Sequence, residues 1–379
     1  MQHADESMEV KVRVVEADKI GSVVSKLRLQ RQLAVVGERR RARVGDAVVV
    51  RALTDSATYN QLELPSGRLA KINPGDVVVG ALGSRRALKG FVGDVPEWVG
   101  AGDRLHLLNM GGVIGCCTGH HSSLSDAIEV EVIGFVYDEE MRARNIADAA
   151  LPLRETLSAS CAPLVVIAGA CMNSGKTYAA TEIVRQATRA GLRVAAAKLS
   201  GVACLRDTLH MADHGAVATA SFLDAGLPST VGVGDLAPVA KAIITKLDES
   251  EPDLIVIELG DGILGGYSVE SVFDDAELRA ATTALVFCAS DYVGAWGGIE
   301  LFRRRGIRVD VVAGSVTDSQ MGEDYVEREF GVPAGNAKRN GARLFELIKN
   351  RVSSFQFSVF SEAEASSTDN DASNLMAEV

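Results

Sequence analysis

The chain has 379 residues, a length that accommodates two domains of ordinary size. Hydrophobic residues make up 47% and aromatic residues 5%, and 37 glycines stand against 9 prolines. This balance is typical of an α/β enzyme and excludes collagen-like, disulfide-rich and fully disordered proteins. The formal net charge of −11 argues against a surface that neutralises phosphates, so no nucleic-acid partner is expected.

The location of the protein follows from what its sequence lacks. The first nine residues are polar and acidic, and no apolar run approaches the ~20 residues that span a bilayer. The six cysteines lie at irregular spacings, unlike those of a disulfide scaffold. We therefore expect a cytoplasmic protein with no membrane partner.

The first half of the chain predicts a β-rich domain over residues 10–137, after a disordered start at residues 1–9. Its apolar runs are short and rich in valine, and glycine turns separate them, at 10–15, 47–50, 76–81, 105–108 and 128–136. This pattern indicates a small β-barrel or sandwich, with local helix at 22–32. Residues 138–162 are expected to form a connector, of which 138–153 are charged and favour a helix.

The second half predicts an α/β domain over residues 163–352. Continuous apolar runs, suited to strands buried on both faces, occur at 164–168, 193–198, 253–258, 283–289 and 308–313. Helical stretches at 176–190, 237–248 and 298–305 separate them. Such alternation indicates a parallel sheet with right-handed crossovers. Residues 353–379 hold acids but no bases, so a disordered acidic tail is expected.

Residues 169–177 read Gly-Ala-Cys-Met-Asn-Ser-Gly-Lys-Thr and follow a buried strand. A phosphate needs converging backbone N–H groups, a helix N-terminus and a lysine, while a threonine hydroxyl suits Mg²⁺. The strict phosphate-loop pattern has glycine where Ala170 stands, one place after Gly169. The predicted nucleotide-binding residues are Gly169, Asn173, Ser174, Gly175, Lys176, Thr177 and the adjoining Tyr178.

The spacing from Gly169 to Thr177 resembles the loop of dethiobiotin synthetase, cobyrinic acid amidase and molybdopterin-guanine dinucleotide adaptor proteins, a branch of the P-loop NTPases. In dethiobiotin synthetase too, the first glycine stands one residue early. Residues 257–264 are similar to that family's glycine-rich acidic segment, and residues 207–216 to a helix of the adaptor proteins. The resemblance covers about 163–351 and leaves the first 150 residues unexplained. It implies an ATP-dependent P-loop fold with Glu258 as a Mg²⁺ ligand.

The positions of the acids support this assignment independently. Carboxylates that hold Mg²⁺ beside a nucleotide should lie at strand C-terminal ends facing the loop. Glu258 ends a predicted strand, with Asp261 as its substitute in the same turn. Asp207 is either a further metal ligand or a helix N-cap. The predicted metal ligands are therefore Thr177, Asp207 and Glu258.

Two lysines are the candidate catalytic residues. Lys176 would stabilise the phosphoryl group in transfer. Lys198 ends the second predicted strand, where ligands collect in open α/β sheets. The family has a lysine followed by proline at a comparable place, where it meets the substrate, but proline is absent here. An exposed strand end is the alternative for Lys198.

Other clusters carry weaker signals. The glycine-rich residues 109–119 lead into Cys116, Cys117, His120 and His121, whose adjacent spacing favours a binding loop or barrel turn over a zinc site. The arginine-rich residues 38–43 favour a solvated hairpin face. Residues 314–318, after the fifth predicted strand, are a candidate contact loop for the nucleotide base.

Together these features predict a Mg-ATP-dependent enzyme that uses the γ-phosphate to activate or phosphorylate a small molecule. A carboxylate activated as an acyl phosphate, as in a ligase, suits the resemblance, and kinase chemistry is equally compatible. The guanine motif Asn/Thr-Lys-x-Asp is missing, so ATP is the default over GTP. The alternatives are a slow NTP-hydrolysing switch or adaptor that signals through the β-domain, and a module that binds without turnover. Homodimerisation stays open.

Overall fold

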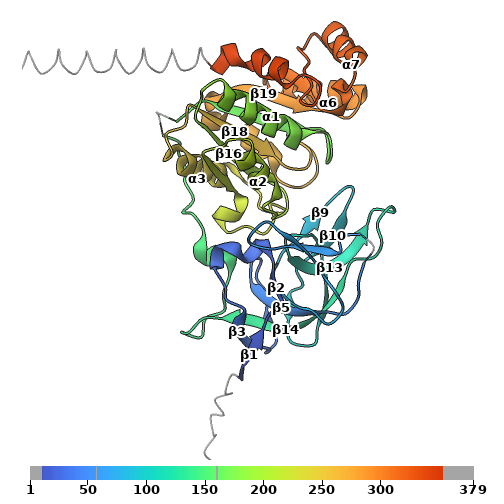
Figure 1. Cartoon of the computed structure of the whole chain (residues 1–379), viewed down its shortest axis with the longest axis vertical. Helices are drawn as coiled ribbons and strands as arrows, with labels where there is room; N and C mark the ends of the chain where they lie inside the picture. The colour runs from blue at the N-terminus through green and yellow to red at the C-terminus, as the bar shows by residue number, and fades with distance from the viewer. Residues whose placement is uncertain (1–10, 57, 159–160, 353–379) are drawn as a thin grey trace, which may run out of the picture.

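The computed structural model describes residues 11–56, 58–158 and 161–352. Figure 1 shows a β-rich N-terminal part beneath an α/β part. The ends predicted to be disordered, residues 1–9 and 353–379, lie outside the described residues. The sequence predicted an α/β parallel sheet with an N-terminal β-barrel or sandwich, and this fold class is confirmed, with a barrel in the N-terminal part.

The N-terminal part is a twisted sheet that closes on itself. The pairings run from β14 to β5, β8, β13 and β12 and then back to β14, which makes a small barrel. The valine-rich runs form its walls, because side chains from these strands pack inside it. The strands are β1 (Val12–Glu16), β2 (Lys19–Ile20), β3 (Gln32–Val36), β4 (Arg40–Arg41), β5 (Ala47–Ala52), β6 (Gln61–Glu63), β7 (Leu69–Lys71), β8 (Val77–Leu82), β9 (Arg85–Arg86), β10 (Phe91–Asp94), β11 (Trp98–Val99), β12 (Arg104–Leu107), β13 (Val113–His120) and β14 (Glu129–Tyr137).

Two short helices replace the helices expected in this half. The predicted helix at 22–32 is a 3₁₀-helix, η1 (Ser22–Leu27), and the chain then turns at Arg28 in the left-handed region. The connector forms a turn and one 3₁₀-helix, η2 (Ile146–Ala149), where Asn145 and Asp148 make a capping box. A longer helix over 138–153 was therefore the wrong expectation, since Asp138 instead closes a turn by accepting a hydrogen bond from the backbone N–H of Arg142.

The C-terminal part is a parallel six-stranded sheet in the order β17-β16-β18-β15-β19-β20. Its strands are β15 (Leu164–Gly169), β16 (Val194–Ser200), β17 (Ala218–Ser221), β18 (Leu254–Leu259), β19 (Thr282–Cys288) and β20 (Val311–Ala313). The sequence analysis missed β17, because four residues of Ala, Thr and Ser carry little hydrophobic signal. Residues 314–318 consequently follow the sixth strand.

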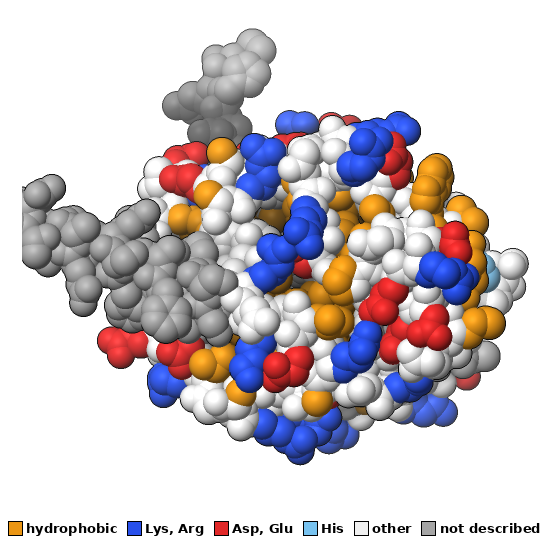
Figure 2. All heavy atoms as spheres, turned by 90° about the horizontal axis from the view of Figure 1, so that it is seen from above, with side chains coloured by type: hydrophobic (Ala, Val, Ile, Leu, Met, Phe, Trp, Pro, Cys, Tyr) orange, Lys and Arg blue, Asp and Glu red, His pale blue; other side chains and the backbone are white. Residues whose placement is uncertain are grey.

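Helices cover both faces of this sheet. One face packs on α1 (Lys176–Arg189) and on a final helix over 341–352. The other face packs on α3 (Ala237–Asp248), on α4 (Val269–Asp274) and α5 (Ala276–Ala281), and on α6 (Tyr292–Arg304). The remaining helices are α2 (Arg206–Asp213), η3 (Phe222–Ala225), η4 (Ser315–Thr317), α7 (Gln320–Tyr325) and η5 (Val326–Phe330). The end of this part seen in Figure 2 mixes basic, acidic and hydrophobic side chains.

The two parts share a hydrophobic core. One cluster of buried side chains runs from the barrel and η1 through η3 to the sheet face that carries α3. Within the described residues, no helix combines the length and hydrophobicity needed to cross a bilayer.

Candidate functional site

The predicted phosphate loop connects β15 to α1 at the centre of the parallel sheet. Asn173 and Gly175 adopt left-handed backbone conformations, with φ of 63° and 100°. A Cβ at Gly169 would lie 2.5 Å from Ser174 Oγ. The early glycine is therefore required by the closeness of the loop to its own strand, while position 170 accepts a methyl group.

Lys176 begins α1 and folds back across the loop. Its Nζ donates a hydrogen bond to Cys171 O at 2.8 Å, and the residue is 5% exposed. Burial lowers the pKa of Lys176, and nearby Glu258 opposes that shift. A phosphate at this loop would give the ammonium a compensating charge.

Glu258 lies beside the loop because β18 pairs with β15, with Ile167 opposite Glu258. Thr177 Oγ1 donates a hydrogen bond to Glu258 Oε1 at 2.9 Å. The glutamate is 1% exposed, and its second oxygen, Oε2, makes no hydrogen bond within the described residues. A buried carboxylate oxygen without a partner is costly, which marks a place where a cation would be stabilised.

Lys198 holds the two predicted metal-binding acids together. Its Nζ forms an ion pair with Asp207 and another with Glu258 Oε1 at 3.1 Å. Burial lowers the pKa of Lys198, but the two carboxylates outweigh it and raise the pKa above the usual value. Asp207 lies in the first turn of α2, and its side chain contacts Lys198 rather than capping that helix. The exposed-strand-end alternative for Lys198 is thus wrong.

Asp261, the substitute acid, lies in the turn after β18 with a φ of 61°. Burial raises its pKa, while Lys176, Arg85 and Lys198 lower it in part. The turn packs tightly on its surroundings, because a Cβ at Gly260 would lie 2.1 Å from Ser200 O and one at Gly262 would lie 2.6 Å from Ala170 O. Glu258, unlike Asp261, accepts a hydrogen bond from the loop residue Thr177.

A hollow adjoins the loop on the side of β20. It is lined by Gly175, Tyr178, Gly314, Ser315, Asp318, Asn336, Ala337 and Lys338. Lys338 Nζ lies 4.5 Å from the ring centroid of Tyr178. Asn336 Nδ2 donates to Asp318 Oδ1 at 2.9 Å, which fixes the wall of the hollow. Sequence reasoning identified 314–318 but missed 336–338, whose nearness depends on folding.

The barrel contacts the segment that leads into α2. Asn109 Nδ2 donates to Ala203 O at 2.7 Å, and Glu63 Oε2 accepts from the backbone N–H of Leu205 at 2.7 Å. Cys204 Sγ donates to Glu63 Oε1 at 3.1 Å. The predicted loop 109–119 thus meets the C-terminal part at its first residues. Glu63 is buried and bonds to Leu205, two residues before Asp207, and nothing in the sequence indicated this contact.

The weaker clusters have structural roles. Cys116, Cys117 and His120 lie on β13, where His120 Nε2 pairs with Asp126 at 3.1 Å. No group of three or more His, Cys, Asp or Glu side chains in the described ranges is arranged to hold a metal ion. In the arginine-rich stretch, Arg40 pairs with buried Asp46 at 2.7 Å and covers the ring of Phe135. That arginine is therefore part of the barrel packing rather than a solvated face.

Comparisons with known proteins give only distant structural matches. No family model and no curated protein matches the sequence. Similar solved structures include a DUF1611 family protein from Anabaena variabilis, with 15% identity, 53% of this chain, 63% of that chain and a TM-score of 0.37. The 54 kDa signal recognition particle protein of Aeropyrum pernix in complex with GDP has 16% identity and a TM-score of 0.33. The match covers 58% of this chain and 54% of that chain. The signal recognition particle receptor FtsY of Elizabethkingia anophelis has 13% identity and a TM-score of 0.35. The match covers 54% of this chain and 70% of that chain.

No family membership follows from these values. The match spans less than two thirds of the DUF1611 protein and of the signal recognition particle protein. None of the three is described as a dethiobiotin synthetase, so that narrower resemblance stays a prediction. The assignment of a P-loop NTPase fold rests on the parallel strand order and on the loop between β15 and α1.

Proposed function

We propose that this protein is a Mg-ATP-dependent enzyme that transfers the γ-phosphate to a small molecule or activates that molecule with it. The observation that carries the proposal is the joint placement of Lys176, Thr177 and Glu258 around one loop. Phosphoryl transfer depends mainly on positioning and on electrostatic stabilisation, and these residues supply both. A bare anion-binding loop would not need a buried glutamate bonded to its threonine.

The residues fit a Mg²⁺ ion. Mg²⁺ prefers oxygen ligands, keeps several waters and takes one or two carboxylates. Thr177 Oγ1 and the unpartnered Glu258 Oε2 offer such oxygens, with Asp207 held nearby through Lys198. When bound, the ion would neutralise charge that develops on the phosphates. Asp207 is the weaker candidate of the two acids, because Thr177 contacts Glu258 and because Glu258 Oε2 has no hydrogen-bond partner within the described residues.

The chain's own groups have distinct roles in this proposal. Backbone N–H groups of residues 169–177 hold the phosphates, and Lys176 exchanges its bond to Cys171 O for the transferring phosphoryl group. Burial alone would raise the pKa of Asp207, but the Lys198 ammonium lowers it below the usual value, so Asp207 stays ionised. The ion pair with Lys198 also holds the carboxylate of Glu258 in place. The nucleotide base would lie on the surface over this shallow hollow, beside exposed Tyr178 and Lys338, rather than inside it.

The acceptor would bind where the barrel meets the loop segment before α2. Asn109 and Glu63 fix this junction, and ligand sites favour the meeting of two structural units. We propose a small carboxylate as acceptor, activated as an acyl phosphate. Homodimerisation is not needed for any of these contacts.

The test is release of ADP and of phosphate from Mg·ATP by the full chain, with and without a panel of small carboxylates. Transfer to the carboxylate yields ADP with the phosphate on the acceptor, whereas hydrolysis yields ADP and free phosphate in equal amounts. Stimulation by one carboxylate, with ADP formed in equal amount to the consumed acceptor, supports the enzyme. Slow release that no small molecule stimulates favours the switch or adaptor. Replacing ATP with GTP in the same assay decides the nucleotide.

A further inference from the structure

A cavity of about 440 Å³ lies toward the N-terminal ends of β15 and β19 in the parallel sheet. It opens beside the first half of β19 and the residues just before β20, whereas the loop follows the last residue of β15. Its volume falls within the range of pockets that take small molecules. Nothing in the proposed ATP chemistry uses this cavity.

The lining combines an apolar floor with basic side chains. Val166, Val272, Phe273, Leu285 and Ile307 supply the apolar surface from β15, α4, β19 and the turn before β20. The charged lining consists of three arginines, Arg279, Arg308 and Arg351, and one acid, Asp310. The cavity wall therefore carries an excess of positive charge, in a protein whose net charge is −11.

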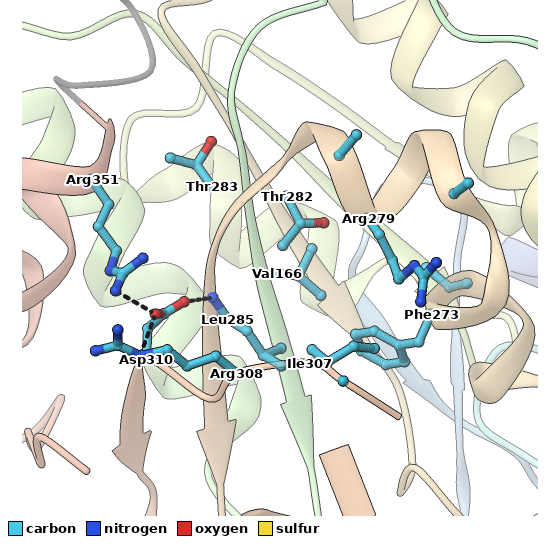
Figure 3. A pocket seen from close by; sticks show the side chains of 14 residues that line it. Val166, Phe273, Arg279, Thr282, Thr283, Leu285, Ile307, Arg308, Asp310 and Arg351 are labelled. Atoms are coloured by element: carbon cyan, nitrogen blue, oxygen red, sulfur yellow. Dashed lines mark hydrogen bonds and ion pairs between the residues drawn. The ribbon is translucent and has the colours of Figure 1, made fainter. Parts of the chain in front are cut away.

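The single acid is already engaged at one end of the cavity. Asp310 is 7% exposed, accepts a hydrogen bond from Leu285 N at 2.9 Å and pairs with Arg351 at 3.1 Å. Arg308 approaches it at 3.6 Å. Figure 3 shows these three side chains together on one side, with Arg279 and Phe273 on the other. Asp310 thus orders two arginines without neutralising the third.

Two polar groups that face the cavity lack partners. Arg279 is an exposed residue on α5, and its guanidinium makes no hydrogen bond or ion pair within the described part of the chain. Thr283 Oγ1 is buried and likewise has no hydrogen-bond partner there. A buried hydroxyl without a partner carries a cost that a ligand acceptor would remove.

We propose that this cavity is a second binding site, for a small anion that carries an apolar body, such as an aromatic or branched carboxylate. The carboxylate would meet Arg279 in a bidentate, charge-assisted contact. The apolar body would cover Val166, Phe273 and Ile307. This inference does not depend on nucleotide binding at the phosphate loop.

The experiment uses ¹⁹F NMR titration of the full chain with 4-(trifluoromethyl)benzoate and with its neutral isostere 4-(trifluoromethyl)benzamide. We expect the benzoate to bind about 10-fold more tightly than the benzamide, the scale of one charge-assisted hydrogen bond. Arg279→Gln should remove that preference. Arg189→Gln, which changes an exposed arginine in the last turn of α1, is the matched control and should keep it.

A second variant tests the location. Ala276 lines the cavity from the exposed surface of α5, so Ala276→Phe should fill the space without disturbing the core, and both probes should lose affinity. Circular dichroism checks that each variant is folded. Absence of benzoate binding at millimolar concentration, equal binding by the Arg279→Gln variant, or displacement of the probe by Mg·ATP would each overturn the proposal.

Discussion

At the scale of single residues, Lys176 is the most direct test of the phosphate loop. It is buried, and its ammonium is satisfied within the loop by Cys171 O. Lys176→Ala should reduce ATP turnover by roughly 10²- to 10³-fold, because the charge that stabilises the transferring phosphoryl group is lost. Phosphate release measures this, and Lys246→Ala, at an exposed ion pair on α3, is the control. Turnover of this variant at the wild-type rate would contradict the proposed role of the phosphate loop in ATP turnover.

Glu258 is expected to act through the metal ion rather than through the nucleotide. Glu258→Gln should leave ATP binding in EDTA unchanged, because the loop amides still hold the phosphates, while Mg²⁺-dependent turnover falls by roughly 10²- to 10³-fold. Titrating Mg²⁺ against turnover measures the effect. Asp261→Asn is the paired variant, since it neutralises the acid three residues on without touching Thr177. A larger loss in Asp261→Asn would mean that the metal acid has been misassigned.

The cysteines allow the loop to be probed chemically. Burial raises the pKa of Cys288 to about 12, and that of Cys161 likewise to about 12, so both thiols should stay unreactive toward iodoacetamide at about pH 8. Cys116 is exposed and Cys171 is partly exposed in the phosphate loop. We expect Mg·ATP to protect Cys171 while Cys116 reacts at an unchanged rate. Mass spectrometry of peptides after timed alkylation measures both, and equal rates at Cys171 would argue against nucleotide at the loop.

At the scale of elements, α6 offers a matched pair of glycines. A Cβ at Gly298 would lie 2.1 Å from ring atoms of Phe287, whereas one at Gly297 would meet nothing within 4 Å. Gly298→Ala should therefore destabilise the fold by about 1–3 kcal/mol through overpacking. Gly297→Ala should stabilise it by up to about 1 kcal/mol through helix propensity. Urea unfolding followed by circular dichroism compares the two variants. Equal changes in the free energy of unfolding would contradict the packing of Gly298 in α6 against Phe287 in β19.

The elements also show what sequence patterns can and cannot predict. The continuous apolar runs at β15 and β18 correctly predicted buried strands, because both faces of each strand are covered in the fold. The segment 218–221 gave no such signal, since it is short and lies at the edge of the sheet. Helix-friendly charges at 138–153 misled the prediction, because a turn at Asp138 and the capping box at Asn145 use those side chains locally.

The candidate site likewise contains residues that the sequence could predict and residues that it could not. Lys176, Thr177 and Glu258 could be proposed from the sequence, because the loop spacing and strand ends fix where they lie. The partnership of Lys198 with two acids, the contribution of Asn336 to the hollow and the role of Glu63 could not. Lys198 and Glu258 lie 60 positions apart and Glu63 and Leu205 lie 142 apart. The shorter-range contacts of Lys198 with Asp207 and of Asn336 with Asp318 depend on how the chain folds back after a strand.

At the scale of the whole molecule, the barrel is joined to the α/β part both by packing and by polar contacts near the site. A common hydrophobic cluster runs through both parts. Glu63 accepts hydrogen bonds from Ser22 in the barrel and from Leu205 before α2, and it is 1% exposed. The same carboxylate therefore links the barrel to the helix that carries Asp207. The barrel is expected to control the geometry of the acids rather than nucleotide capture.

Glu63→Ala tests this coupling. The backbone N–H of Leu205 would lose its acceptor, which should cost about 1–3 kcal/mol of folding stability and loosen the start of α2. Because the phosphate-binding residues all follow position 168, ATP affinity should stay near that of the wild type, while carboxylate-stimulated turnover falls. Glu129→Ala, which removes the partner of exposed Arg104 on the barrel, is the control and should change neither. Calorimetric ATP binding and phosphate release, measured below the unfolding transition, separate the two effects. If stimulated turnover survives in Glu63→Ala, the barrel is an interaction module independent of the chemistry, and the switch or adaptor alternative gains support.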